Sequence, residues 1–344
     1  MARGRSVVGV GEEIDAILDG DFTVAVAQVT PLRGVVLAPV NSFGWDAGNR
    51  TFRFTSDLAA YKKLRRMERN PKVAIVFHTR DHGVAYGEGY IVVQGDASFS
   101  WHPDHDELAD FYQRPGTALG PDDLGGPVWD RWLAPFWWDR VVVRVRAHRI
   151  IAFADRSCSR RTSVLGAVEP LGRPAPQAPP RKGAGPRVDV DRVVRELDSL
   201  PPRLLGWVGA DGYPMVTPVQ AVKSAADGLT LTTPAGLVPS GGRRAGLTGH
   251  AFTAGTLGQR QVTLTGWLES DGASVHYAPH TRLSYTVPAS RLVWRTVVGT
   301  VTRVGLERAR HEGVPSLPPR RIHHMRIPFV GTRSARCAPT SGNT

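Results

Sequence analysis

The sequence predicts a mainly β protein with a minority of helices, arranged as two similar halves. Short runs of β-branched and apolar residues, many alternating with polar ones, recur along most of the 344-residue chain and are separated by turn residues. The order of these runs repeats after a proline-rich stretch, and a short amphipathic helix precedes each series. A hydrophobic content of 41% and a charged content of 22% are ordinary for globular proteins, so both halves are expected to bury a core.

The first series begins with a helix and a meander of strands. Residues 12–18 place isoleucine and leucine on one side of a short helix. Residues 22–29 and 34–39 are β-rich runs joined by a hairpin-like connection. A turn over residues 46–49 leads into a strand over residues 51–55, in which phenylalanines alternate with polar residues.

A cationic helix is predicted next, over residues 57–69. Asp57 stands at the N-cap position, and Asn70-Pro71 ends the helix. An apolar stripe recurs at three-residue steps, at Leu58, Tyr61, Leu64 and Met67. The opposite face carries Lys62, Lys63, Arg65, Arg66 and Arg69. This face is either a solvated surface or, together with nearby hydroxyl groups, a phosphate site in which each charge-assisted hydrogen bond contributes roughly 1.5–3 kcal/mol.

The rest of the first series consists of strands on either side of a helical insertion. Residues 73–77 and 89–97 are predicted strands, and a glycine in the second, Gly95, indicates a bulge or a close backbone approach. Residues 101–138 form the insertion, and residues 141–153 again alternate as a strand.

Two clusters in the insertion are candidates for binding. The first contains Trp129, Trp132, Trp137 and Trp138, interpreted foremost as core or domain-contact residues and alternatively as walls of a site for a planar ligand. The second contains His102, Asp104, His105 and Asp106. The spacing of the second cluster matches no standard metal site, and its first aspartate fits a helix cap, so we predict no metal site.

The second series follows a linker. We predict domains at residues 1–157 and 189–312, a Pro- and Arg-rich linker at 158–188, and a disordered basic tail at 313–344. Residues predicted to correspond to elements of the first series are 204–208, 214–222, 229–233 and 260–266, after an entry helix at 189–200. Residues 243–247 stand where the cationic helix stood, as a shortened helix, and residues 289–293 correspond to the strand segment 147–151.

Charge and cysteine content set broad limits on location and partners. The net charge of +12 suits an anionic partner; nucleic acid binding through the basic helix and tail is an alternative, and nucleic acid is not the partner we expect. Cys158 and Cys337 have no spacing typical of a metal cluster or a disulfide framework, which favours a reducing cytoplasm. No apolar run approaches the ~18 residues of a membrane span, so we expect a cytoplasmic protein without a membrane partner.

One stretch resembles a known family. The sequence TFRFTSDLAAYKKLRRMERNPKVAIVF combines a strand ending in Thr-Ser, a helix with Lys-x-Arg, an Asn-Pro stop and an apolar strand, and the strand YIVVQG follows later. This pattern resembles the pyridoxamine 5'-phosphate oxidase-like group, which are split-β-barrel flavoproteins with deazaflavin-using relatives. The resemblance implies two tandem split β-barrel domains that form an intrachain pseudo-dimer.

The resemblance also implies site residues. Contacts with the cofactor phosphate are implied for Thr55, Ser56, Lys62, Lys63 and Arg65, contacts near the ring for Pro39, Val40 and Asn41, and flavin contacts for Arg260 and Gln261. The second series has neither a full Lys-x-Arg helix nor Asn-Pro. We therefore expect the first half to hold the phosphate and the second half to supply the facing wall.

The function implied is an FMN-binding oxidoreductase that acts on an unknown small molecule. A deazaflavin-dependent reductase and a non-catalytic flavin- or haem-binding protein are the alternatives. The C-terminal segment of a true pyridoxamine phosphate oxidase is absent, so vitamin B6 oxidation is not expected. The sequence contains no dinucleotide fingerprint or nucleophile elbow, and it assigns no catalytic residue. Both a monomer and a homodimer remain open.

Overall fold

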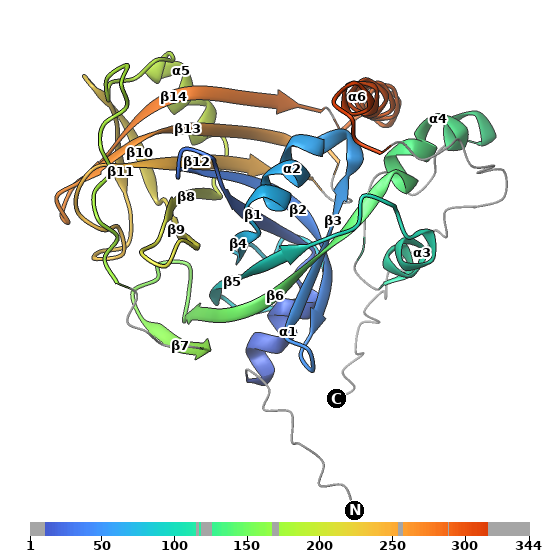
Figure 1. Cartoon of the computed structure of the whole chain (residues 1–344), viewed down its shortest axis with the longest axis horizontal. Coiled ribbons are helices and arrows are strands. Elements are labelled where there is room, and N and C mark those ends of the chain that lie inside the picture. The colour runs from blue at the N-terminus through green and yellow to red at the C-terminus, as the bar shows by residue number, and fades with distance from the viewer. Residues whose placement is uncertain are drawn as a thin grey trace, which may run out of the picture.

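The computed structural model describes residues 11–114, 117, 126–166, 172–253, 257–287 and 289–315. Within these ranges the protein is mainly β, with fourteen strands in two sheets, six α-helices and one short 3-10 helix (Figure 1). The predicted basic tail and Cys337 lie largely or wholly outside the described residues. None of the described helices is long and apolar enough to cross a membrane.

The N-terminal half (residues 11–166) contains a closed, antiparallel, six-stranded barrel. Its strands are β1 (Thr23–Val29), β2 (Val35–Asp46), β3 (Thr51–Asp57), β4 (Lys72–Phe77), β5 (Tyr90–Ser98) and β6 (Arg140–Phe153). The order is β3-β2-β1-β4-β5-β6, and pairing of β3 with β6 closes the barrel, while β7 (Arg161–Gly166) pairs with the end of β6. The register shifts between Gln94 and Gly95, which confirms the irregularity predicted at that glycine.

The C-terminal half (residues 172–315) contains the second sheet. Its strands are β8 (Arg203–Val208), β9 (Pro214–Pro218), β10 (Ala221–Ala225), β11 (Gly228–Thr232), β12 (Arg243–Ala251), β13 (Arg260–Ser270) and β14 (Val275–Thr286). The pairings follow the pattern of the barrel: β8 pairs with β9 and β12 as β1 pairs with β2 and β4, and β11 pairs with β14 as β3 pairs with β6. The counterpart of β2 is divided into β9 and β10, and this half-barrel sheet is open between them in the described chain.

Helices cover the ends and sides of the two sheets. They are α1 (Glu12–Gly20), the 3-10 helix η1 (Leu58–Ala60), α2 (Tyr61–Arg69), α3 (His105–Gln113), α4 (Pro127–Trp138), α5 (Val190–Asp198) and α6 (Arg291–His311). The predicted cationic helix is divided into η1 and α2. The carboxylate of Asp57 is the N-cap of η1 and accepts a hydrogen bond from the amide of Ala59 at 2.7 Å, and α2 ends before Asn70-Pro71 as predicted.

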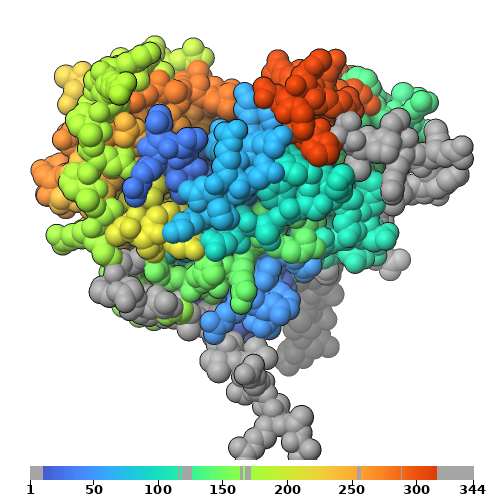
Figure 2. Space-filling model, viewed as in Figure 1, coloured from blue at the N-terminus to red at the C-terminus, as the bar shows by residue number. Residues whose placement is uncertain are grey.

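Two sequence predictions for the second half are wrong. Residues 243–247 form the start of β12 rather than a shortened helix, so the described part of the second half contains no counterpart of α2. Residues 289–293 lead into α6 rather than forming a strand, and β14 is the counterpart of β6. The helix α6 contacts η1 and α4 of the N-terminal half, and Figure 2 shows it beside the segment that contains η1 and α2.

The two halves share one core. On β1, Val24 and Val26 lie inside the barrel, whereas Ala25 and Ala27 pack in a cluster that includes strands of the second sheet. All seven residues of β1 are therefore buried. A Cβ added at Gly246 would lie 2.3 Å from the carbonyl oxygen of Val35 on β2, so the backbones of the two halves approach too closely there for a side chain.

Candidate functional site

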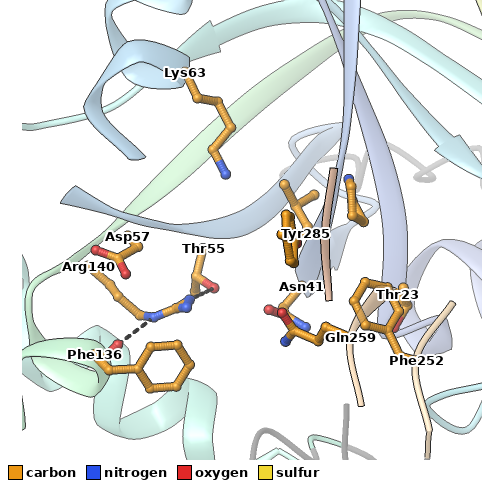
Figure 3. A pocket seen from close by; sticks show the side chains of 12 residues that line it. Thr23, Asn41, Thr55, Asp57, Lys63, Phe136, Arg140, Phe252, Gln259 and Tyr285 are labelled. Atoms are coloured by element: carbon orange, nitrogen blue, oxygen red, sulfur yellow. Dashed lines mark hydrogen bonds between the residues drawn. The ribbon is translucent and has the colours of Figure 1, made fainter. Parts of the chain in front are cut away.

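A cavity of about 140 Å³ lies where the two halves meet. Its walls come from the N-terminal half at Thr23, Pro39, Val40, Asn41, Thr55, Asp57, Lys63, Phe136 and Arg140, and from the C-terminal half at Phe252, Gln259 and Tyr285. Figure 3 shows charged side chains toward one end and amide, hydroxyl and aromatic side chains toward the other. The cavity thus has a charged end and a neutral end, which we name accordingly.

The charged end is built on β3, α2 and β6. Strand alternation places Thr55 and Asp57 on the same face of β3, and Arg140, the first residue of β6, is directly opposite Asp57 in the register. Arg140 is 6% exposed; its Nη1 donates to Oγ1 of Thr55 at 3.2 Å and its Nε donates to the carbonyl oxygen of Phe136 at 2.9 Å. Lys63 reaches the same end from α2 (Figure 3).

Burial changes the protonation equilibria at the charged end. Desolvation, with a smaller effect of the neighbouring Arg140, lowers the pKa of Lys63 to about 8. Desolvation also raises the pKa of Asp57, although Arg140 and the amide of Ala59 act in the opposite direction. Two cationic side chains and one carboxyl therefore share a poorly solvated wall, and an added anion would relieve the repulsion between the cations.

The neutral end is built on β1, β2, β14 and the loop between β12 and β13. Thr23 and Asn41 are cross-strand partners on β1 and β2, and both line the cavity. Tyr285 on β14, 41% exposed, lies at the boundary between the cavity and solvent, and Phe252 adds a second aromatic wall. An aromatic wall beside amide and hydroxyl groups suits a flat heterocycle.

The structure brings five of the ten predicted site residues to the cavity: Pro39, Val40, Asn41, Thr55 and Lys63. The other five do not line it. Ser56 is on the opposite face of β3 from Thr55, and Lys62 is exposed on the outer face of α2. Arg65 forms an ion pair with Glu68 at 2.9 Å and lies over the ring of Trp101.

The two predicted residues on β13 lie near the cavity without lining it. Gln261 is the register partner of Tyr285, and its Nε2 donates to Oγ1 of Thr263 at 2.7 Å. Arg260 is exposed, and its guanidinium donates to the hydroxyl of Ser199.

Sequence reasoning missed seven lining residues: Thr23, Asp57, Phe136, Arg140, Phe252, Gln259 and Tyr285. Asp57 was predicted only as a helix cap. The sequence could have indicated Asp57 as a lining residue, because it is two positions after Thr55 and residues two apart on a strand share a face. Arg140 carried no periodic signal, since it is the first residue of its strand, and the three residues of the C-terminal half depend on how the halves pack.

The tryptophan cluster has the role favoured by the sequence. Trp137 and Trp138 are 1% and 2% exposed in a core formed with α3 and the start of α6, and Trp129 and Trp132 pack against that core. None of the four lines the cavity. In the second cluster, Asp104 accepts a hydrogen bond from the amide of Glu107 at 3.0 Å as the N-cap of α3. Among the described residues, no group of three or more His, Cys, Asp or Glu side chains could hold a metal ion.

A pair of buried histidines joins the halves behind Phe252. The Nε2 atoms of His78, which follows β4, and His250, on β12, are 3.0 Å apart. His78 also contacts the carbonyl oxygen of Val76 through Nδ1, so Nδ1 carries its hydrogen and Nε2 accepts from His250. Desolvation lowers the pKa of His78 to about 4 and that of His250 well below its usual value.

No family model matches the sequence, and no curated protein matches it. Solved structures with similarity to parts of the chain include a Clostridium acetobutylicum protein related to general stress protein 26 of Bacillus subtilis, described as of the pyridoxinephosphate oxidase family. It is 10% identical, with a TM-score of 0.28, and the match covers 42% of this chain and 84% of that one.

Two further similar structures are flavin-binding by description. A pyridoxamine 5'-phosphate oxidase-related, FMN-binding protein from Nostoc punctiforme is 14% identical, with a TM-score of 0.27, over 39% of this chain and 74% of its own. A FAD-binding protein from Mesorhizobium loti is 17% identical, with a TM-score of 0.25, over 43% of this chain and 91% of its own. Each match spans less than half of this chain. We therefore infer the chemistry of the cavity from the residues that line it and not from these structures.

Proposed function

We propose that this protein binds FMN in the cavity between its halves and acts as a flavin-dependent oxidoreductase on a small molecule. The observation that carries the proposal is the convergence of Lys63, Arg140 and the hydroxyl of Thr55 on the charged end of the cavity. Cationic donors on a poorly solvated wall bind phosphate through charge-assisted hydrogen bonds, each worth roughly 1.5–3 kcal/mol.

The residues present fit the two ends of a flavin mononucleotide. The phosphate group would lie against Lys63 and Arg140, and the ring system would lie toward Asn41 and the aromatic walls of Phe252 and Tyr285. Pockets that enclose a whole ligand of this size have volumes of roughly 300–1,000 Å³. The cavity, at about 140 Å³, is smaller, so part of the ring would lie outside it, over the exposed ring of Tyr285.

When bound, the flavin supplies hydride or electron transfer, and the chain's own residues bind and orient it. No described residue needs to act as a nucleophile for this chemistry, which agrees with the absence of a nucleophile motif from the sequence. A ring edge that stays open at Tyr285 leaves room for a small-molecule substrate to approach.

The two halves have different roles in this proposal. We interpret the matching pairings of the two sheets as a tandem duplication, in which the chain forms within itself the pairing that two subunits would otherwise form. Among the described residues of the C-terminal half, no helix corresponds to α2, and Lys63 comes from the N-terminal half. The C-terminal half provides the facing wall through Phe252, Gln259 and Tyr285.

The test is the visible absorption spectrum of the purified protein, followed by fluorescence titration of the apoprotein with FMN. We expect a flavin spectrum and saturable binding. Lys63→Ala should weaken FMN binding by at least about tenfold, because it removes one charge-assisted contact.

Lys62→Ala is the matched control. It removes the same charge from the same helix at an exposed position outside the cavity, so FMN binding should stay within about twofold of wild type. Equal losses in the two variants would contradict the site. If the purified protein shows the spectrum of deazaflavin or haem and the apoprotein does not bind FMN, that other cofactor is the ligand and the assignment of FMN is wrong.

A further inference from the structure

The side chain of Thr23 is held between the cavity and a histidine that bridges the two halves. Thr23 is 3% exposed and lines the neutral end of the cavity. Its Oγ1 is 3.1 Å from Nδ1 of His82, and Nε2 of His82 is 3.1 Å from the carbonyl oxygen of Thr253 in the C-terminal half. The three groups form a chain of two hydrogen bonds that ends at the cavity.

The direction of both hydrogen bonds follows from the chemistry of the groups. A carbonyl oxygen can only accept, so Nε2 of His82 carries the hydrogen that is donated to Thr253. In a neutral imidazole the other nitrogen then has a lone pair and no hydrogen. With His82 neutral, the hydroxyl of Thr23 donates its only hydrogen to Nδ1 of His82, and it has only lone pairs left for other partners.

The backbone fixes the position of His82. The amide of Phe22 donates to the carbonyl oxygen of His82 at 3.0 Å, and the next residue, Gly83, pairs with Asp21 beside the start of β1. Gly83 has a φ of 106°, and an added Cβ would lie 2.2 Å from the carbonyl oxygen of Gly20. The backbone of His82 is therefore held beside the start of β1, from where its ring reaches Oγ1 of Thr23.

We propose that Thr23 is a fixed hydrogen-bond acceptor that selects a ligand with an N–H group at the neutral end of the cavity, and that His82 is its positioning residue. Asn41, the cross-strand partner of Thr23, lines the same end and has an amide that donates to a carbonyl group. The pair is complementary to an edge in which N–H is next to C=O, as in a cyclic imide. This inference rests on the proposed function, because it assigns the imide edge of the flavin ring to Thr23.

The binding test compares FMN with N3-methyl FMN, which lacks the N–H, by titration of the apoprotein. Wild type should prefer FMN by about tenfold, and Thr23→Ser, which keeps the hydroxyl, should retain the preference. Thr23→Val keeps the shape and removes the acceptor, so the preference should disappear through weaker binding of FMN. If Thr23→Val keeps the wild-type preference while FMN still binds, the inference is wrong and the proposed function stands.

The second arm needs no flavin. Nitrogen-15 NMR of the ligand-free protein labelled at histidine should show His82 as the tautomer with hydrogen on Nε2. In His82→Leu the hydroxyl of Thr23 is free to rotate. The ratio of the dissociation constants of N3-methyl FMN and FMN should therefore be smaller than in wild type. A hydrogen on Nδ1 of His82 would overturn the inference even if FMN binds. Failure of the wild-type protein to bind FMN would contradict the proposed function. In that case the tautomer of His82 in the ligand-free protein would still show whether Thr23 is a hydrogen-bond acceptor.

Discussion

Nη1 of Arg140 donates a hydrogen bond to Oγ1 of Thr55 at 3.2 Å, which links the first residue of β6 to the end of β3 at the wall of the cavity. The same guanidinium is held through Nε by the carbonyl oxygen of Phe136. A cation fixed by two neighbours is oriented before any ligand arrives, so little side-chain entropy is lost when an anion binds.

Arg140→Lys should weaken FMN binding by about tenfold although it keeps the positive charge. A lysine has no planar fork, so it cannot hold Phe136 and Thr55 and face a phosphate together. Titration with FMN checks the loss, and titration with riboflavin, which has no phosphate, is the control and should change little. Equal losses for both ligands would show that the variant disturbs the cavity as a whole.

The affinity for FMN should fall above pH 8. The pKa of Lys63 is about 8 in the free protein because of desolvation, so at higher pH the phosphate must bind a neutral amine or take up a proton. The dissociation constant should rise by up to about tenfold per pH unit above 8, until the pKa of Lys63 in the complex is reached. Titrations at pH 7 to 9.5 measure this, and Lys63→Met should remove the dependence. A constant affinity across the range in wild type would contradict the role of Lys63.

The stability of the fold should decrease between pH 6.5 and 4 because of the buried histidine pair. The pKa of His78 falls from 6.5 to about 4 on folding, so the unfolded chain binds a proton first as the pH is lowered. The free energy of unfolding should therefore fall by about 1.4 kcal/mol per pH unit for this histidine and level off below pH 4. Urea unfolding at several pH values checks the slope. The slope should become shallower in His78→Gln, and an unchanged slope would rule out this histidine as its cause.

Gly246→Ala should destabilise the protein by about 1–3 kcal/mol, because the added methyl group meets the backbone of Val35 and separates the two sheets. Gly185→Ala is the matched control, since an added Cβ there has no neighbour within 4 Å. Urea unfolding compares the two variants. Equal stabilities would mean that the contact between the sheets tolerates an extra atom, contrary to the geometry.

Much of the N-terminal half could be predicted because its signals are local. The two-residue alternation of residues 51–55, the cap at Asp57 and the stop at Asn70-Pro71 predict β3 and the helical segment of η1 and α2 without reference to other parts of the chain. These elements place Thr55 and Lys63 at the cavity. The family resemblance implied Ser56 for the same site, but alternation along a strand turns it to the other face.

The helix α6 shows why other parts could not be predicted. It is rich in valine and threonine and contains two glycines, a composition that favours strands and turns. Its buried residues, Trp294, Gly299, Thr302, Leu306 and Ala309, recur at helical spacing against the N-terminal half, and an added Cβ at Gly299 would meet the ring of Trp132 at 2.0 Å. Packing between distant segments thus determines that residues 291–311 are helical. It also determines that Phe252 and Tyr285 line the same cavity as Lys63.

The ratio of the dissociation constants of riboflavin and FMN for the wild-type apoprotein tests the central claim most directly, because the two ligands differ only in the phosphate. Lys63 and Arg140 at the charged end of the cavity predict that FMN binds at least about 100-fold more tightly, from two contacts of roughly 1.5–3 kcal/mol each. A ratio near one, with both ligands bound, would contradict a phosphate site at this end of the cavity.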